Sequence, residues 1–227
     1  MERDLSRITE DSVFIIGAGH FGARAARIIC QRSDSPLFVV DPDEKSLSDL
    51  NDLRTEKVLG DGIQFLIDNF HYLKQTNTIV PALPVHLAYE WLKGFLPGDM
   101  KIKKLPVPET KPPLPNAWPA SEGSMLVSYA DFLCPDDCPE PASCTVTGER
   151  REQPLYALLS NLDLPPFNVH IIRSRQLAPG LGGYKVADLK IVAEKVSTNK
   201  AKMWILGTAC KCHGILTAFE VNKEIVK

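Results

Sequence analysis

Five of the six cysteines in this chain fall into two short groups that could hold a metal ion or carry redox chemistry. Three lie within residues 134–144, and two lie within residues 210–212, directly before a histidine. Thiolate sulfur is a preferred ligand of zinc and of iron–sulfur clusters. Three thiolates from the first group and one from the second would complete a four-sulfur site. The sequence therefore predicts a thiol-rich site drawn from Cys134, Cys138, Cys144, Cys210 and Cys212.

The spacing of these cysteines leaves the content of the site open. It matches neither the paired C-x2-C of zinc ribbons nor the ferredoxin run. Prolines directly follow Cys134 and Cys138, and proline next to a ligand cysteine also occurs in ferredoxin-type motifs, which favours an iron–sulfur cluster. Zinc is the first alternative, and metal-free thiols, either redox-active or structural, are the second. One of the five thiols is spare in a four-ligand site, or His213 replaces Cys212 as a ligand.

A second candidate site is the glycine-rich turn at residues 17–22. Residues 13–16 are four consecutive apolar residues that predict a buried strand, and strong helix formers follow the turn. Gly17 allows the turn, Gly19 lets a pyrophosphate approach the backbone, and Gly22 lets the helix pack closely on the strand. The N–H groups at the helix N-terminus would then bind the phosphates.

An acidic residue at the end of the next predicted strand completes the pattern. The apolar run 37–40 ends at Asp41, about 20 residues beyond the last glycine, as a dinucleotide-binding fingerprint requires. A carboxylate there accepts hydrogen bonds from the adenosine ribose and repels a 2′-phosphate, which favours NAD(H) over NADP(H). The predicted cofactor-binding residues in these two segments are Gly17, Gly19, His20, Phe21, Gly22 and Asp41.

These segments together resemble a known family. The glycine turn 17–22, the strand end 39–41 and the segment 59–62 look like the NAD-binding domain of bacterial potassium-transport regulators, the RCK or TrkA-N family. The resemblance covers residues 13–95, and the rest of the chain departs from that pattern. It implies a Rossmann fold with the glycine turn on the phosphates, the acidic residue on the ribose and Asp61 near the adenosine.

A second glycine-rich stretch, residues 176–185, precedes another predicted helix, and two arginines come shortly before it. A glycine loop at a helix N-terminus can hold an anionic group of a substrate, and arginine side chains reinforce such binding. The alternative is a flexible surface connection with solvated arginines. The candidate anion site comprises Arg173, Arg175, Gly182 and Gly183.

Strands and helices alternate over residues 13–100, which is typical of a parallel sheet with crossover helices. Six prolines in residues 101–123 exclude a central strand or helix over most of that stretch, and Trp118 favours a segment that wraps the body. The alternation resumes in residues 124–227. We therefore predict one α/β domain over residues 1–227, with a Rossmann-like doubly wound, mostly parallel sheet and an elaborated C-terminal half.

The predicted strands also place the two cysteine groups. The first group follows the predicted strand 125–130, and the second follows a strand that ends near Leu206. If both strands run parallel to the first strand of the chain, both groups emerge at the carboxyl edge of the sheet, where the nicotinamide would lie. Residues 203–206 and 215–221 are predicted to form a hairpin around this second group.

Composition narrows the classes of function. The net charge of −2 argues against nucleic-acid binding, and no apolar run approaches the ~20 residues that span a bilayer. The charged start, residues 1–4, lacks the apolar core of a signal peptide, so we expect a cytoplasmic protein without membrane partners. A Ser/His/Asp elbow, an H-E-x-x-H motif and a P-loop are all absent, which disfavours hydrolases and NTPases.

These patterns together favour an NAD(H)-binding oxidoreductase or electron-transfer protein with a cysteine-ligated iron–sulfur or zinc site beside the nicotinamide. Its partner would be a small molecule or a redox protein. One alternative is a non-enzymatic module that senses NAD(H) or another adenine nucleotide, with the cysteines as a structural staple. Another is a subunit of a larger redox complex, and a homo-oligomer is compatible with each.

Overall fold

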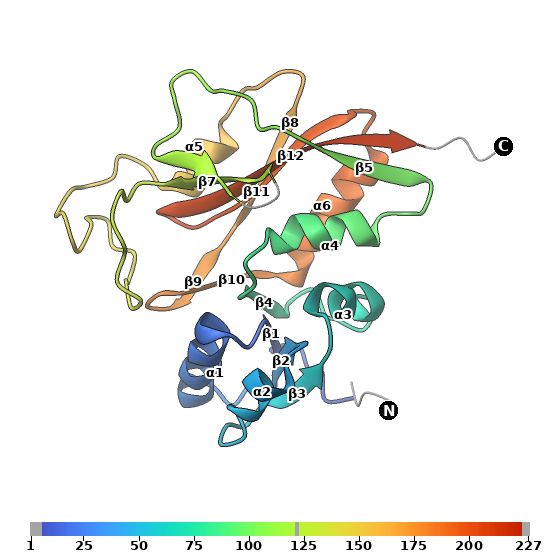
Figure 1. Cartoon of the computed structure of the whole chain (residues 1–227), viewed down its shortest axis with the longest axis vertical. Helices are drawn as coiled ribbons and strands as arrows, with labels where there is room; N and C mark the ends of the chain where they lie inside the picture. The colour runs from blue at the N-terminus through green and yellow to red at the C-terminus, as the bar shows by residue number, and fades with distance from the viewer. Residues whose placement is uncertain (1–5, 121–122, 224–227) are drawn as a thin grey trace. The chain divides into compact units, whose positions relative to one another are not determined.

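The structure is a computed structural model that describes residues 6–120 and 123–223 (Figure 1). The charged residues 1–4, on which the expectation about a signal peptide rests, lie outside the described residues. Within the part of the chain that is described, no helix is both long enough and apolar enough to cross a membrane.

The chain divides into two compact units. The first comprises Met1–Gly94 together with Gly183–Ile191, and the second comprises Phe95–Gly182 together with Val192–Lys227. The glycine turn lies in the first unit, and both cysteine groups lie in the second unit.

Four parallel strands form the centre of the first unit. They lie in the order β3-β2-β1-β4, and each neighbouring pair is parallel. In Figure 1, α1 and α3 flank these strands from opposite sides. Every residue of β2 is buried, because its apolar run faces helices on both sides. The elements are β1 (Val13–Ile16), α1 (His20–Arg32), β2 (Leu37–Asp41), α2 (Glu44–Ser48), β3 (Glu56–Leu59), α3 (Gly62–Asn69), β4 (Thr78–Pro81) and α4 (Leu87–Phe95).

Two further strands extend this sheet beyond β4. β10 (Leu181–Lys185) pairs with β4 in the antiparallel direction, and β9 (Arg175–Ala178) is the last strand of the sheet. The turn between β9 and β10 contains Gly180, whose φ of +68° is a left-handed conformation that favours glycine. The helix α6 (Val186–Thr198) directly follows β10.

The second unit contains a separate sheet in the order β6-β7-β12-β11-β8. The long strand β12 pairs with β11 along one side, and along the other side it pairs first with β7 and then with β5. Helix α5 packs on this sheet, and its Leu155 and Leu159 join a core with Leu216 of β12. The elements are β5 (Met100–Leu105), β6 (Ala117–Pro119), β7 (Met125–Ser128), α5 (Leu155–Ser160), β8 (Asn168–Arg173), β11 (Met203–Ala209) and β12 (His213–Lys223).

The prediction of a doubly wound, mostly parallel sheet is therefore wrong. The chain forms two mixed sheets, and among residues 6–120 and 123–223 the parallel pairs lie within β1–β4 and between β8 and β11. The physical reason is the connections: parallel neighbours need a crossover, whereas the predicted hairpin after β11 and a second hairpin after β9 impose antiparallel pairing.

The proline-rich stretch contributes strands only at its two ends. β5 ends at Leu105, before the first proline, and β6 is a short exposed strand at the edge of the second sheet. Pro119 lies in β6, and proline is tolerated in an edge strand because one side of that strand needs no N–H donor.

Candidate functional site

The glycine turn has the close packing that its sequence predicts. Gly17 has a φ of +105°, and a Cβ at this position would lie 2.5 Å from the carbonyl oxygen of Ala82. A Cβ at Gly22 would overlap the carbonyl oxygen of Gly17. The turn is fixed further by a hydrogen bond of 2.8 Å that the Gly17 N–H donates to the Val40 carbonyl oxygen. Two of the three glycines are therefore required by geometry alone.

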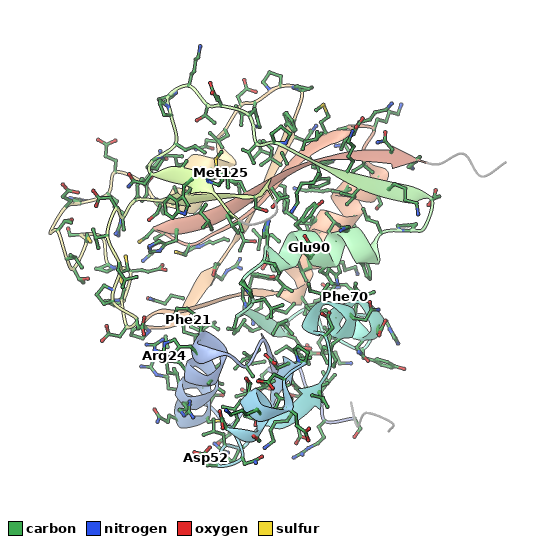
Figure 2. The ribbon with its side chains drawn as sticks, in the orientation of Figure 1. Phe21, Arg24, Asp52, Phe70, Glu90 and Met125 are labelled. Atoms are coloured by element: carbon green, nitrogen blue, oxygen red, sulfur yellow. The ribbon has the colours of Figure 1, made fainter. Side chains whose placement is uncertain are left out.

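Gly19 differs from the other two glycines because the space above it is open. It is the N-cap residue of α1, with an ordinary φ of −60°, and no side chain caps the helix. Nothing lies within 4 Å of the place where its Cβ would be. Figure 2 shows Phe21 and Arg24 on the first turns of α1, and the Phe21 side chain is 64% exposed. The helix N-terminus thus presents backbone to an unfilled space, with His20 and Phe21 beside it.

Asp41 joins the end of β2 to the glycine turn. Its carboxylate is buried and accepts hydrogen bonds from the backbone N–H of Ala18 at 2.6 Å and of Asp43 at 2.8 Å. Each carboxylate oxygen accepts up to two hydrogen bonds, so each keeps one acceptor position. The Gly60 N–H donates to the Asp41 carbonyl oxygen at 3.0 Å, and the next residue, Asp61, caps α3 through the Gln64 N–H.

The candidate anion site does not form as a loop. Gly182 and Gly183 lie within strand β10, so the predicted glycine loop before the helix is a hairpin strand instead. The Arg173 guanidinium lies 4.4 Å from the centre of the Tyr156 ring, a cation–π contact, and Arg175 begins β9. This stretch forms a strand because β4 offers an open edge, with which Tyr184 and Lys185 pair.

The two cysteine groups lie at the same edge of the second sheet. β7 and β11 both pair antiparallel with β12, so they run parallel to each other, and each ends just before one cysteine group. The loop that contains Cys134 follows β7, and the turn that contains Cys210 joins β11 to β12. These strands belong to the sheet of the second unit, not to the parallel strands that contain the glycine turn.

His213 brings the two groups into contact. Its Nε2 lies 3.4 Å from the Sγ of Cys134, and its Nδ1 lies 3.9 Å from the Sγ of Cys210. The Cys210 sulfur also accepts hydrogen bonds of 3.4 Å from the backbone N–H groups of Cys212 and of His213. The sequence raised His213 only as a substitute ligand, because its side chain follows the cysteines directly, and spacing alone does not reveal a contact with Cys134.

The cysteines experience different electrostatic environments. Burial, followed by the neighbouring thiols of Cys138 and Cys144, raises the pKa of Cys134. Hydrogen bonds from the backbone N–H groups of Thr147 and Val146 lower the pKa of Cys144. A hydrogen bond from the Cys210 thiol lowers the pKa of Cys212.

The cysteine loop is anchored by its backbone. The Cys138 carbonyl oxygen accepts hydrogen bonds from the Gly180 N–H at 2.8 Å and from the Gln176 side-chain amide at 2.9 Å. A Cβ at Gly180 would overlap the carbonyl oxygen of Asp136. The Nζ of Lys211 donates to the Glu140 carbonyl oxygen at 2.8 Å. The glycine of the β9–β10 turn therefore fits against the cysteine loop, which sequence analysis did not anticipate.

Two further observations concern metal binding and the sixth cysteine. Within residues 6–120 and 123–223, no group of three or more His, Cys, Asp or Glu side chains is arranged so that it could hold a metal ion. Cys30 lies apart on α1, half-buried, with its Sγ 3.8 Å from the Arg54 carbonyl oxygen.

A cavity of about 340 Å³ adjoins the cysteine loop and was also missed by sequence analysis. Cys144 lines it together with Tyr129 and five charged residues, Asp131, Glu149, Arg150, Arg151 and Glu152. Its residues come from the segment directly after β7, from the loop around Cys144 and from α5, so it belongs entirely to the second unit.

Comparisons with known proteins cover most of the chain. Residues 88–222 match the model of the family AF_1314_C, described as "Uncharacterized protein, C-terminal domain". An uncharacterized protein of Archaeoglobus fulgidus is 31% identical over 224 residues, which cover 91% of this chain and 98% of that protein. No solved structure matches the chain. The matched region of the family contains both cysteine groups and His213.

Proposed function

For this chain, which belongs to the AF_1314_C family, we propose NAD(H) binding at the glycine turn between β1 and α1. The observation that carries the proposal is the contrast among three glycines. Neighbouring backbone occupies the places where a Cβ of Gly17 or Gly22 would lie, whereas Gly19 faces open space at a helix N-terminus that no side chain caps. Backbone N–H groups and the helix dipole at such an end favour a phosphate group.

Asp41 supports a dinucleotide rather than a free phosphate. Its carboxylate is held at the turn by two backbone N–H groups and keeps one acceptor position on each oxygen. Ribose hydroxyls can donate to these positions, whereas a 2′-phosphate would place a second negative charge beside the carboxylate. The proposal therefore includes a preference for NADH over NADPH. The resemblance to RCK and TrkA-N domains supports the same roles for His20, Phe21 and Asp61.

The test is calorimetric titration of the full chain with NADH, NAD⁺ and NADPH. The informative variant is Gly19→Asp, which places a carboxylate in the open space. Gly98→Asp is the matched control, since Gly98 also has nothing within 4 Å of its Cβ position and receives the same charge. Hydrogen bonds to a charged group contribute about 1.5–3 kcal/mol, so Gly19→Asp should weaken NADH binding at least about tenfold.

The outcomes separate the parts of the proposal. Saturable NADH binding that Gly19→Asp weakens and Gly98→Asp leaves unchanged supports the glycine turn as the site. Equal affinity for NADPH and NADH would refute the role given to Asp41. Wild-type protein that binds none of the three nucleotides would refute the proposal as a whole.

A second candidate function is oxidoreduction or electron transfer, which the contact between the two cysteine groups favours. NADH releases a hydride, and a disulfide formed by two of these cysteines would accept it together with a proton and become two thiols. The test is anaerobic mixing of NADH with the purified chain, followed by the NADH absorbance. Loss of that absorbance supports electron transfer. Binding that changes the oligomeric state without oxidising NADH supports a sensor of the nucleotide instead.

A further inference from the structure

We propose that Cys134, Cys144, Cys210 and His213 bind one zinc ion at the edge of the second sheet, independently of the nucleotide site. These four side chains come from two segments, the loop after β7 and the turn between β11 and β12. The set is three thiolates and one imidazole, which is one of the common donor sets of structural zinc.

Two of the four donors have the spacing of ligands on one ion. Zinc binds sulfur at about 2.3 Å and imidazole nitrogen at about 2.0–2.1 Å with tetrahedral angles, which places a sulfur and a nitrogen ligand about 3.5 Å apart. The Sγ of Cys134 and the Nε2 of His213 are 3.4 Å apart. The Sγ of Cys210 faces the other ring nitrogen, Nδ1, at 3.9 Å, so the His213 ring or one of the two sulfurs has to move for all three to bind the same ion. In a [4Fe–4S] cluster each iron binds one protein ligand, so the ligands stand apart by the width of the cluster and the contact between Cys134 and His213 disfavours such a cluster.

Two of the thiols are prepared for a metal by their own turns. The Cys210 sulfur accepts hydrogen bonds from the N–H groups two and three residues later, and the third residue is His213 itself. Cys144 receives the same pair of hydrogen bonds, from Val146 and Thr147. Such N–H donors stabilise a thiolate, which is the form of cysteine that binds metal. In the metal-free chain this effect lowers the pKa of Cys144, whereas the hydrogen bond with Cys212, followed by burial, raises the pKa of Cys210.

The three remaining cysteines fit the site less well. Cys212 lies in the turn before β12 and is 1% exposed, although its neighbour His213 is exposed, and its thiol is hydrogen-bonded to that of Cys210. Cys138 lies near Cys134, but its backbone is bound by Gly180 and Gln176, and it has no pair of N–H donors like that of Cys144 among the described contacts. Cys30 lies in the first unit. These three serve as matched controls.

A closed four-ligand site of this kind is structural. The ion would join the loop after β7 to the β11–β12 turn, which are linked otherwise by backbone contacts such as the hydrogen bond from the Tyr129 N–H to the Cys212 carbonyl oxygen. Metal removal should therefore loosen the cysteine loop and leave the first unit intact. The length of the loop, about 25 residues of irregular backbone, is unusual without such a constraint.

The experiment is metal analysis of the full chain followed by replacement of zinc with Co²⁺. The expected result is one zinc per chain, and a Co²⁺ form with the intense visible bands of a tetrahedral ion and near-ultraviolet charge-transfer bands from three thiolates. Cys134→Ser, Cys144→Ser, Cys210→Ser and His213→Ala should each weaken zinc binding at least about 100-fold, because even outer-sphere partners contribute 10–100-fold. Cys30→Ser, Cys138→Ser and Cys212→Ser should bind zinc like the wild type.

Three results would overturn the proposal. The first is wild-type protein that contains no zinc and gives no Co²⁺ bands. The second is acid-labile sulfide in anaerobically purified protein, which identifies a cluster. The third is a Cys138→Ser or Cys212→Ser variant that loses zinc while Cys144→Ser keeps it. The wild-type Co²⁺ spectrum decides even if a ligand variant fails to fold, and chelation followed by limited proteolysis of the cysteine loop gives a second readout.

Discussion

Replacing Gly22 by alanine perturbs the tightest contact of the glycine turn. A methyl group at this position would overlap the carbonyl oxygen of Gly17. That oxygen cannot easily move, because Gly17 is at a φ of +105° and its N–H is bonded to Val40. The helix α1 would have to shift away from β1 to make room.

The expected magnitude follows from two opposing effects. In an unhindered helix, alanine is more favourable than glycine by about 0.5–1 kcal/mol. An extra carbon forced into a packed region costs about 1–3 kcal/mol, and the upper end applies here because the neighbour is backbone. We therefore expect Gly22→Ala to lower the free energy of unfolding by about 1–2 kcal/mol.

The assay is urea unfolding followed by circular dichroism, with an unchanged m-value as the sign of a pure stability change. Gly98→Ala is the control, since its Cβ position has nothing within 4 Å, and it should change the free energy of unfolding by less than about 0.5 kcal/mol. A Gly22→Ala protein as stable as the wild type would refute the close packing of α1 on the turn, and with it the geometric reason for the glycine.

Three other substitutions or treatments have defined outcomes. The Tyr184 hydroxyl is buried without a hydrogen-bond partner among the described residues. Tyr184→Phe should therefore leave the free energy of unfolding unchanged or raise it by about 1 kcal/mol. A loss of stability on urea unfolding would contradict this. Gly180→Ala should destabilise the second unit by about 1–3 kcal/mol, because its φ is +68° and a methyl group would overlap Asp136, and proteolysis of the cysteine loop should accelerate. Because the pKa of Cys144 is lowered, its thiolate is lost only as the pH falls through that lowered value. In metal-free protein, iodoacetamide should therefore modify Cys144 at a lower pH than the pH at which it modifies an ordinary cysteine. The extent of modification is measured by mass spectrometry as a function of pH. A midpoint pH at or above that of a free thiol would refute the claim that the N–H groups of its turn stabilise the Cys144 thiolate.

The parallel strands of the first unit were predictable from the sequence because the patterns that indicate them are local. The strands at residues 13–16, 37–41 and 78–81 are apolar runs bounded by turn residues, and each was predicted within one residue. The second sheet was not predictable in the same way. Helices α5 and α6 alternate with strands along the chain, which suggests crossovers, but β12 pairs on both sides through contacts distant in sequence.

The candidate sites also divide into parts that local sequence predicts and parts that depend on contacts distant in sequence. The roles of Gly17 and Gly22 could be inferred from spacing, because a strand–turn–helix leaves few ways to pack three glycines. The convergence of the cysteine groups required the parallel direction of β7 and β11, which the order of elements only suggested. The fit of Gly180 against the cysteine loop depends on a tertiary contact, and a proline–glycine pair predicts only a turn.

The most direct test of nucleotide binding is an NADH titration of isotopically labelled protein, followed through its backbone amide resonances. The account predicts saturable shifts concentrated in residues 17–22 and around Asp41, with the Gly19 amide among the largest. Saturable shifts that leave this turn unmoved, or no saturable shift at all, would contradict it.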